Sequence, residues 1–281
     1  MRIAKIERAG AFAPAVIDGD EALVIGPWVS GSAAAIAFDA PASSLGDLRA
    51  RAAAATERLP LADVKLAAPA SPLTKFVCLG LNYRNHVEET LNDIPENPTL
   101  FLKVSDALVA HDEPILRPRV SDHFDYEGEI AVVIGKPGRH IAKEDALSHV
   151  FGYTIMLDGS VRDYQTHSPT AGKNFWQSGS LGPWIVTADE IPDPTRLTLE
   201  TRLNDQQVQH TTADLMLYDI PTAIAYVSRW TPLSPGDIIA TGTPAGVGAR
   251  RQPPLWMKAG DVVEVDVSGI GTLRNPVEDE G

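Results

Sequence analysis

The segment DYEGEIAVVI, residues 125–134, joins two glutamates to an apolar run that is typical of a buried β-strand. On an extended backbone, side chains two positions apart point to the same side, so we expect Glu127 and Glu129 to project together while Gly128 leaves the opposite side bare. Two neighbouring carboxylates repel each other unless a proton or a cation lies between them. The segment therefore predicts a strand that begins at a cation site, although a Glu-Gly-Glu sequence alone is more often a solvated pair on an edge strand.

A third carboxylate follows another apolar run. Asp158 comes directly after Val150–Leu157, which reads as a strand, and functional side chains commonly emerge where a strand ends. Three carboxylates without a histidine or cysteine companion favour Mg²⁺ or Mn²⁺, and would also accept Ca²⁺ in crystals, whereas Zn²⁺ prefers nitrogen and sulfur ligands. Water and substrate would fill the remaining coordination positions.

The bulk composition narrows the class of protein. The 281 residues carry a net charge of −13 and are 44% hydrophobic, which is enough apolar material for a sizeable core. Nucleic-acid binding needs clustered Lys and Arg, and the densest basic spot is the pair Arg250-Arg251, so we expect no nucleic-acid partner. A carboxylate site that holds a cation can still bind an anionic substrate.

Compartment and membrane contact are read from what the sequence lacks. The single cysteine, Cys78, cannot form an internal disulfide, and the start MRIAKIER has no apolar signal-peptide stretch. The one long uncharged stretch, residues 22–38, is interrupted by glycine and proline and is too short to span a bilayer comfortably. We therefore expect a cytoplasmic protein without membrane contact.

Turn and linker residues divide the chain near residue 70. The segment LAAPASP, residues 66–72, is typical of a linker, so residues 1–70 are predicted to form a small N-terminal α+β domain and residues 71–281 a catalytic, metal-binding domain. In the first part we expect three strands and a helix capped by Ser43 or Ser44. The strands are Met1–Glu7, Pro14–Ile17 and Glu21–Ile25, and the helix is Ser44–Leu59.

The second part is rich in strand patterns and poor in helices. Predicted strands are Lys75–Leu79, Ile130–Ile134, Val150–Leu157, Ser180–Thr187, Arg196–Leu203, Val263–Val267 and Thr272–Asn275. Predicted helices are Asn85–Leu91, Lys143–Ser148 and Ile220–Arg229, the last with Asp219 as its N-cap. No regular βαβ alternation appears, so the fold class is α+β, mostly β, and a doubly wound fold is unfavoured.

Five segments between about residues 75 and 275 are similar, in order, to the motifs of the fumarylacetoacetate hydrolase family. LGLNYRNHVEE at 79–89 resembles its lid motif G-x-N-Y-x-x-H-x-x-E, and YEGE at 126–129 resembles its E-x-E metal pair. DGSVRDYQ at 158–165 looks like D-x-[TS]-x-R-D-x-Q, GKNF at 172–175 carries the expected lysine, and TGTPAGVG at 241–248 resembles T-G-T-P-x-G-V-G. Five independent matches in family order make a chance similarity very improbable.

The resemblance implies a two-domain bacterial protein similar to acylpyruvate hydrolases, with a catalytic domain of the β-roll or sandwich type. Glu127, Glu129 and Asp158 would bind a cation that chelates two oxygens of an acylpyruvate or related 1,3-diketo acid and stabilises the pyruvate enolate released when a C–C bond is hydrolysed. An oxaloacetate-type decarboxylase or an isomerase of a 2-keto acid in catabolism uses the same chemistry and is the alternative. A catalytically silent binding protein is a third hypothesis, against which the intact site residues argue.

By the same resemblance, His86 and Glu89 form a water-activating dyad on a mobile lid. Their i, i+3 spacing puts them on one face of a helical turn, where Glu89 would orient the imidazole and His86 would act as general base. Glu88 is a rival partner, but its i, i+2 spacing points it elsewhere. Lys173 would pair with the substrate carboxylate or with the developing oxyanion.

Three further residues are expected to contact the substrate. Arg162 and Gln165 lie one helical turn beyond Asp158, and the Thr243 hydroxyl together with the nearby glycine-rich backbone can bind a carboxylate. For all three, a purely structural role is the alternative. The resemblance also implies a small-molecule keto-acid substrate and a homodimer formed through the larger domain.

Overall fold

Strand β12 (Gly128–Ile134) lies at the centre of the computed structural model, which describes residues 1–33 and 37–281. All of its residues are buried. Ile130, Val132 and Ile134 pack into one apolar cluster, whereas Ala131 and Val133 belong to a second cluster. Because both faces of the strand are covered, its sequence is a continuous apolar run rather than an alternating one.

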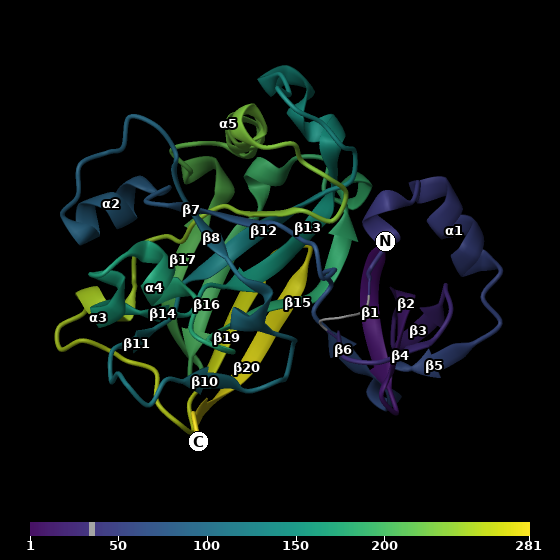
Figure 1. Cartoon of the computed structure of the whole chain (residues 1–281), viewed down its shortest axis with the longest axis horizontal. Helices are drawn as coiled ribbons and strands as arrows, with labels where there is room; N and C mark the ends of the chain where they lie inside the picture. The colour runs from purple at the N-terminus through teal and green to yellow at the C-terminus, as the bar shows by residue number, and fades with distance from the viewer. Residues whose placement is uncertain (34–36) are drawn as a thin grey trace.

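The strand belongs to a large open sheet that extends from the N-terminal part of the chain into its main part (Figure 1). In spatial order the sheet consists of β5 (Arg58–Pro60), β3 (Glu21–Val24), β2 (Ala11–Asp18), β1 (Arg2–Arg8), β15 (Gly179–Thr187), β13 (Val150–Leu157), β12, β18 (Ile238–Ala240), β7 (Phe76–Gly80) and β8 (Thr99–Lys103), with β4 (Val29–Ser30), β6 (Lys65–Ala67) and β9 (Leu108–Val109) beside it. The pairs β7–β18 and β9–β15 are parallel, and the other named neighbours are antiparallel.

A smaller open sheet covers one face of β12. Its strands, in order, are β10 (Ile115–Arg117), β20 (Gly271–Asp279), β19 (Val262–Val267), β16 (Thr198–Leu203) and β17 (Gln206–Thr212), and a separate pair is formed by β11 (Phe124–Asp125) and β14 (Ser160–Val161). Leu199 and Val265 share the apolar cluster of Ile130, so the two sheets pack face to face. In β19 buried and partly exposed residues alternate, which confirms the predicted half-buried strand.

Helices are short and lie outside the sheets (Figure 1). The α-helices are α1 (Leu45–Ala53), α2 (Arg84–Thr90), α3 (Arg162–Gln165), α4 (Pro169–Lys173) and α5 (Ile220–Trp230). Single 3₁₀ turns include η2 (Ala40–Ala42), η3 (Leu61–Asp63), η4 (Ser105–Ala107), η6 (Ala188–Glu190), η7 (Pro194–Arg196), η8 (Ala213–Leu215) and η9 (Gly248–Arg250). The predicted α+β, mostly β class with few helices is confirmed, as is the Asp219 N-cap, whose Oδ1 accepts a hydrogen bond from the Thr222 N–H at 2.8 Å.

Two predicted helices differ from the structure. The helix expected over Ser44–Leu59 ends at Ala53, and β5 follows because its residues pair with the free edge of β3. The helix expected over Lys143–Ser148 is the 3₁₀ segment η5 (Lys143–His149), in which the Asp145 N–H bonds to the Ala142 carbonyl three residues back. In both places pairing or short connections between strands outweigh local helix propensity.

The strands β8, β17 and β18, which surround the site, are missing from the sequence-based prediction. Strand β18 has only three residues, and β17 is mostly polar because half of its side chains face solvent. Such segments carry a weak periodic signal, so their place is decided by the pairing partners.

The N-terminal part is joined to the rest of the chain by direct strand pairing. In the β1–β15 pair, Arg2 lies opposite Val186 and Ile3 opposite Ile185. Apart from this pair, the strands β1 to β6 pair only with one another in the described part of the chain. The division near residue 70 stays a prediction, and residues 34–36 of the long uncharged stretch lie outside the described residues.

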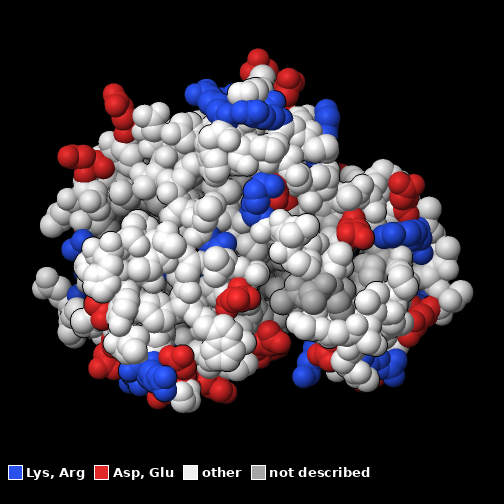
Figure 2. Space-filling view, in the orientation of Figure 1, with Lys and Arg blue, Asp and Glu red and all other residues white. Residues whose placement is uncertain are grey.

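The surface shows mixed charge. On the face in Figure 2, Lys and Arg lie among Asp and Glu in small groups that are separated by uncharged surface. Within residues 1–33 and 37–281, no helix is long and apolar enough to cross a membrane. The expected absence of a nucleic-acid partner stays a prediction.

Candidate metal centre and its cavity

Three buried carboxylates meet where β12 and β13 lie side by side. Glu127 precedes β12, Glu129 is its second residue, and Asp158 follows β13. In this pair Gly128 lies opposite Leu157, and the Asp158 N–H donates to the Glu127 carbonyl at 2.8 Å. The register brings one oxygen of each of the three side chains within 4.8 Å of the others. The residues predicted to bind a cation are therefore close together.

The glycine between the two glutamates is required by packing. A Cβ atom at Gly128 would lie 2.3 Å from Thr201 Oγ1 and 2.9 Å from Val265 Cγ1, both on the smaller sheet. Because the bare side of β12 touches that sheet, Glu127 and Glu129 are left on the opposite side, as the sequence predicts.

Three cationic side chains surround the carboxylates. Lys173 Nζ lies 2.6 Å from Glu127 Oε2 and 2.7 Å from Asp158 Oδ2. Arg162 Nη1 lies 2.7 Å from Glu127 Oε1, and Lys103 Nζ lies 2.7 Å from Asp158 Oδ1. Burial raises the pKa of Glu127, but Lys173 and Arg162 outweigh this effect and lower it to about 2. Glu127 is therefore ionised at neutral pH.

Glu129 has no such compensation. It accepts a hydrogen bond from the Gly242 N–H at 2.9 Å, and it makes no ion pair with a Lys or Arg in the described part of the chain. Burial, Asp158 and Glu127 together raise its pKa well above the ordinary value. A buried carboxylate without a cationic partner calls for a proton or a cation. The all-oxygen donor set fits a hard divalent cation, so the triad can hold one.

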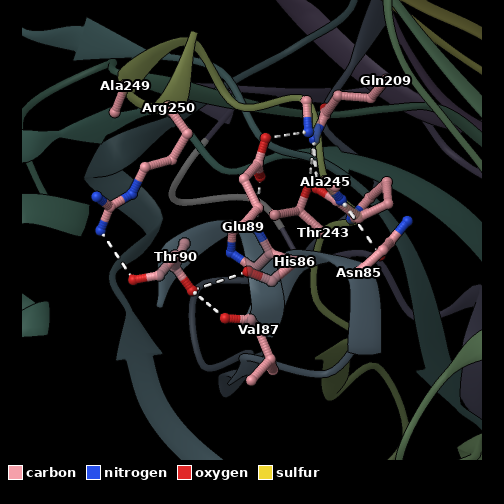
Figure 3. Close-up of polar contacts among 12 residues, drawn as sticks. Asn85, His86, Val87, Glu89, Thr90, Gln209, Thr243, Ala245, Ala249 and Arg250 are labelled. Carbon is pink, nitrogen blue, oxygen red and sulfur yellow. Dashed lines mark hydrogen bonds and ion pairs between the residues drawn. The ribbon is translucent and has the colours of Figure 1, made fainter. Parts of the chain in front are cut away.

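The predicted dyad forms on helix α2. His86 Nδ1 lies 3.3 Å from Glu89 Oε2, and His86 is buried. Glu89 Oε1 in turn accepts a hydrogen bond from the Gly246 N–H at 2.9 Å. Figure 3 shows the two side chains side by side, with Glu89 also reaching the glycine-rich loop. Exposed Glu88 makes no such contact, which agrees with the i, i+3 argument.

The loop that holds Glu89 depends on glycine at position 246. Gly246 has φ +109°, and a Cβ atom there would lie 2.1 Å from the Val208 carbonyl oxygen. Only glycine adopts this conformation so close to a neighbouring backbone. The glycine-rich sequence at 241–248 is thus needed for the turn that presents an N–H group to Glu89.

A cavity of about 430 Å³ lies between α2 and the carboxylates. Its wall includes Glu127, Lys173, His86 and Arg162, and apolar residues such as Phe101. A second cavity, of about 320 Å³, lies against the N-terminal strands and contains none of the predicted site residues. The larger cavity is therefore the candidate substrate site.

Arg162, Gln165 and Thr243, which are predicted to contact the substrate, all line this cavity. They differ in whether their polar atoms already have hydrogen-bond partners. Arg162 Nη1 also donates to Gln165 Oε1 at 3.0 Å, and its Nη2 is buried without a hydrogen-bond partner. A buried donor without a partner is costly, so Nη2 is suited to a ligand oxygen. The Thr243 hydroxyl instead donates to the Gly128 carbonyl at 3.0 Å and accepts from Gln209, so its proton is already used.

Three residues of the site are missing from the sequence-based prediction: Lys103, Asp125 and Arg250. Asp125 accepts hydrogen bonds from the N–H groups of Gly248 and Ala249 and pairs with Arg162, so it fixes the glycine-rich loop beside the carboxylates. Asp125 stands two residues before Glu127, and this closeness to a predicted metal ligand is the feature of the sequence that could have indicated its role. Lys103 ends β8 and Arg250 ends η9, and neither has a spacing pattern that could have revealed it.

Comparison with known proteins gives a family and several relatives. The family pattern described as "Fumarylacetoacetate (FAA) hydrolase C-terminal" matches residues 75–278. The chain is 42% identical over 223 residues to oxaloacetate tautomerase YisK of Bacillus subtilis, covering 77% of this chain and 74% of that one. It is 40% identical over 219 residues to the mitochondrial oxaloacetate tautomerase fahd2 of Xenopus laevis, covering 76% and 69%.

The fold is also found among solved structures. The structure described as fumarylacetoacetate hydrolase from Exiguobacterium antarcticum superposes with a TM-score of 0.83 and 34% sequence identity, over the full length of both chains. The similarity therefore includes the N-terminal part as well as the segment that carries the carboxylates.

Proposed function

Because the chain belongs to the fumarylacetoacetate hydrolase family, we propose that it is a divalent-metal-dependent isomerase that interconverts the enol and keto forms of oxaloacetate or a close 2-keto acid. The observation that carries the proposal is that His86, a proton-transfer group, lines the same cavity as Glu127 of the carboxylate triad. The choice of isomerisation over C–C hydrolysis rests on relatives that are about 40% identical and are named oxaloacetate tautomerases.

Keto–enol exchange needs one proton to leave carbon or oxygen and another to arrive. When His86 Nδ1 carries a proton, it donates to Glu89, and Nε2 is left free to accept a proton from the substrate. Glu89 stabilises the imidazolium that results and keeps the ring in the same orientation. The chain thus provides a single reversible proton carrier.

The remaining side chains of the site would stabilise the negative charge of the substrate. Glu127, Glu129 and Asp158 would hold Mg²⁺ or Mn²⁺, whose Lewis acidity stabilises negative charge on the 2-keto oxygen. Lys173 keeps a charged ammonium group, since Asp158 and Glu127 outweigh burial and raise its pKa. The Nη2 donor of Arg162, which has no hydrogen-bond partner among the described residues, would bind the carboxylate next to the ketone.

C–C hydrolysis of an acylpyruvate is the second candidate. It is favoured by the full-length similarity to the structure described as a fumarylacetoacetate hydrolase. In that reaction His86 would take a proton from water instead of from the substrate. Decarboxylation of oxaloacetate shares the cation and Lys173 but removes a carboxylate rather than a proton.

One set of assays separates these reactions. Enol-oxaloacetate is mixed with the protein and Mg²⁺ or Mn²⁺, and the loss of enol ultraviolet absorbance is followed, while released pyruvate and cleaved acetylpyruvate are measured in parallel. We expect accelerated ketonisation that His86→Gln slows by about 10²-fold or more, with slower or no cleavage and decarboxylation. Metal-loaded protein that leaves the ketonisation rate unchanged would exclude the isomerase proposal.

Assembly and location belong to the same proposal. A homodimer through the larger domain is expected from the family, and sedimentation of the purified chain tests it. A cytoplasmic location stays a prediction, because several relatives are named as mitochondrial.

A further inference from the structure

Arg250 lies at the lid side of the cavity. It is the last residue of η9, its side chain lines the same cavity as Glu127 and Lys173, and Arg250 is exposed. Its Nη2 donates a hydrogen bond to the carbonyl oxygen of Thr90, the last residue of α2, at 3.0 Å. Figure 3 shows this contact, which joins the glycine-rich side of the cavity to the end of the lid helix.

Within the described part of the chain, Arg250 has no carboxylate partner, whereas the other cations of the cavity, Arg162 and Lys173, do. Arg162 pairs with Asp125 and Glu127, and Lys173 pairs with Glu127 and Asp158. Among the residues that the structure describes, Arg250 makes no ion pair, and Thr90 is the one acceptor of its guanidinium. A guanidinium has five N–H donors in a planar fork that matches a carboxylate, so most of them remain for a ligand.

We infer that Arg250 binds the second carboxylate of a dicarboxylate substrate. This inference rests on the proposed function, which places the 2-keto acid end of the substrate at the carboxylate triad. A cavity of about 430 Å³ that extends from Glu127 to Arg250 accommodates a four-carbon diacid between the two sites. Arg250 is then the residue that selects oxaloacetate-like diacids over 2-keto acids with one carboxylate.

The same contact couples the substrate to the lid. A guanidinium can hold the Thr90 carbonyl through Nη2 and a carboxylate through its other N–H groups at the same time. A diacid would therefore strengthen the link between η9 and the end of α2, the helix that carries His86. A monoacid would bind without this contribution.

The test measures binding without turnover. Mg²⁺-loaded protein is titrated by calorimetry with 3,3-difluoro-oxaloacetate and with 3,3,3-trifluoropyruvate, which lack hydrogen on C3 and cannot enolise; they differ in the second carboxylate. We expect Arg250→Gln to weaken the diacid by at least about tenfold, the size of a lost charge-assisted hydrogen bond, and to change the monoacid by less than about twofold. Arg84→Gln is the matched control, since Arg84 is an exposed arginine at the start of α2 and does not line the cavity.

Equal weakening of both ligands by Arg250→Gln, or no weakening of either, would overturn the inference. Arg250→Lys keeps the charge without the planar fork, so it should bind the diacid better than Arg250→Gln does, and an equal loss in both variants also speaks against a carboxylate contact. These titrations do not depend on catalysis. If the wild-type protein fails to ketonise enol-oxaloacetate but still shows the Arg250-dependent preference, the proposed reaction fails while the diacid site stands.

Discussion

The ammonium group of Lys103 lies 2.7 Å from Oδ1 of Asp158, and both side chains are fully buried. Lys173 holds the other oxygen of the same carboxylate at 2.7 Å. The two lysines thus fix the orientation of Asp158 from opposite sides. Lys103 also donates to the Lys173 backbone carbonyl, so the end of β8 and the end of α4 are tied to one carboxylate.

We expect Lys103→Met to destabilise the metal-free protein. Removing one partner of a buried pair leaves a carboxylate with less compensation, and we expect a loss of about 3–5 kcal/mol in the free energy of unfolding, measured in urea. Addition of Mg²⁺ should stabilise this variant more than it stabilises the wild type, because the cation replaces a missing positive charge.

The control for this variant is Lys143→Met. Lys143 pairs with Asp219 at 2.9 Å, but both side chains are about half exposed, so its loss should cost less than about 1 kcal/mol. Equal destabilisation by the two substitutions would mean that the buried Lys103–Asp158 pair contributes no more to the free energy of unfolding than an exposed pair does.

The sequence predicted those parts of the site that lie close together along the chain. Glu127 and Glu129 are two residues apart on a strand, and His86 and Glu89 are three apart on a helix, so strand and helix periodicity place each pair. Lys103 reaches Asp158, and Arg250 reaches the cavity, only through the pairing of distant strands and loops. A single lysine at the end of a strand, or one arginine of an Arg-Arg pair, carries no periodic signal.

The same distinction explains the fold. Residues 130–134 are buried on both faces and stand out as an apolar run, whereas Arg58–Pro60 follows a helical sequence and becomes a strand only because β3 offers a free edge. Local patterns therefore gave the mostly-β class, and the order of strands in the sheets depended on contacts between remote segments.

Glu89→Gln should slow ketonisation by about tenfold or more, and His86→Gln by about 10²–10⁴-fold, the usual range for a general acid–base group. The neutral amide can still accept the Gly246 hydrogen bond but cannot stabilise the imidazolium. Glu88→Gln, one residue away and exposed, should leave the rate unchanged. A loss of rate with Glu88→Gln as large as that with Glu89→Gln would contradict the assigned pair.

The N-cap of α5 should make stability depend on acid pH. Burial raises the pKa of Asp219, but the hydrogen bonds from Thr222 and Lys143 outweigh it and bring the pKa below its usual 3.8. A carboxyl with a lowered pKa contributes stability above its unfolded pKa and loses it as pH falls through the folded one. Asp219→Ala should therefore cost about 1 kcal/mol near pH 6, and the difference should shrink below about pH 4.

Unfolding in urea at pH 6 and at lower pH checks this expectation. Asp122→Ala is a suitable control, because the Asp122 side chain is 91% exposed. A gap between Asp219→Ala and wild type that stays constant down to the lowest pH studied would show that the ionised carboxylate is not what stabilises the helix.

Glu127→Ala should abolish detectable binding of Mg²⁺ or Mn²⁺ in calorimetry. The substitution removes one of three converging carboxylates and also takes away one of the two acidic partners of Lys173 and of Arg162, so less compensated positive charge would face an incoming metal ion. Glu144→Ala, on the exposed part of η5, removes the same charge elsewhere and should leave the affinity as in the wild type. Affinity that survives in Glu127→Ala would place the cation outside the triad, and the raised pKa of Glu129 would then mean that this carboxyl simply holds a proton.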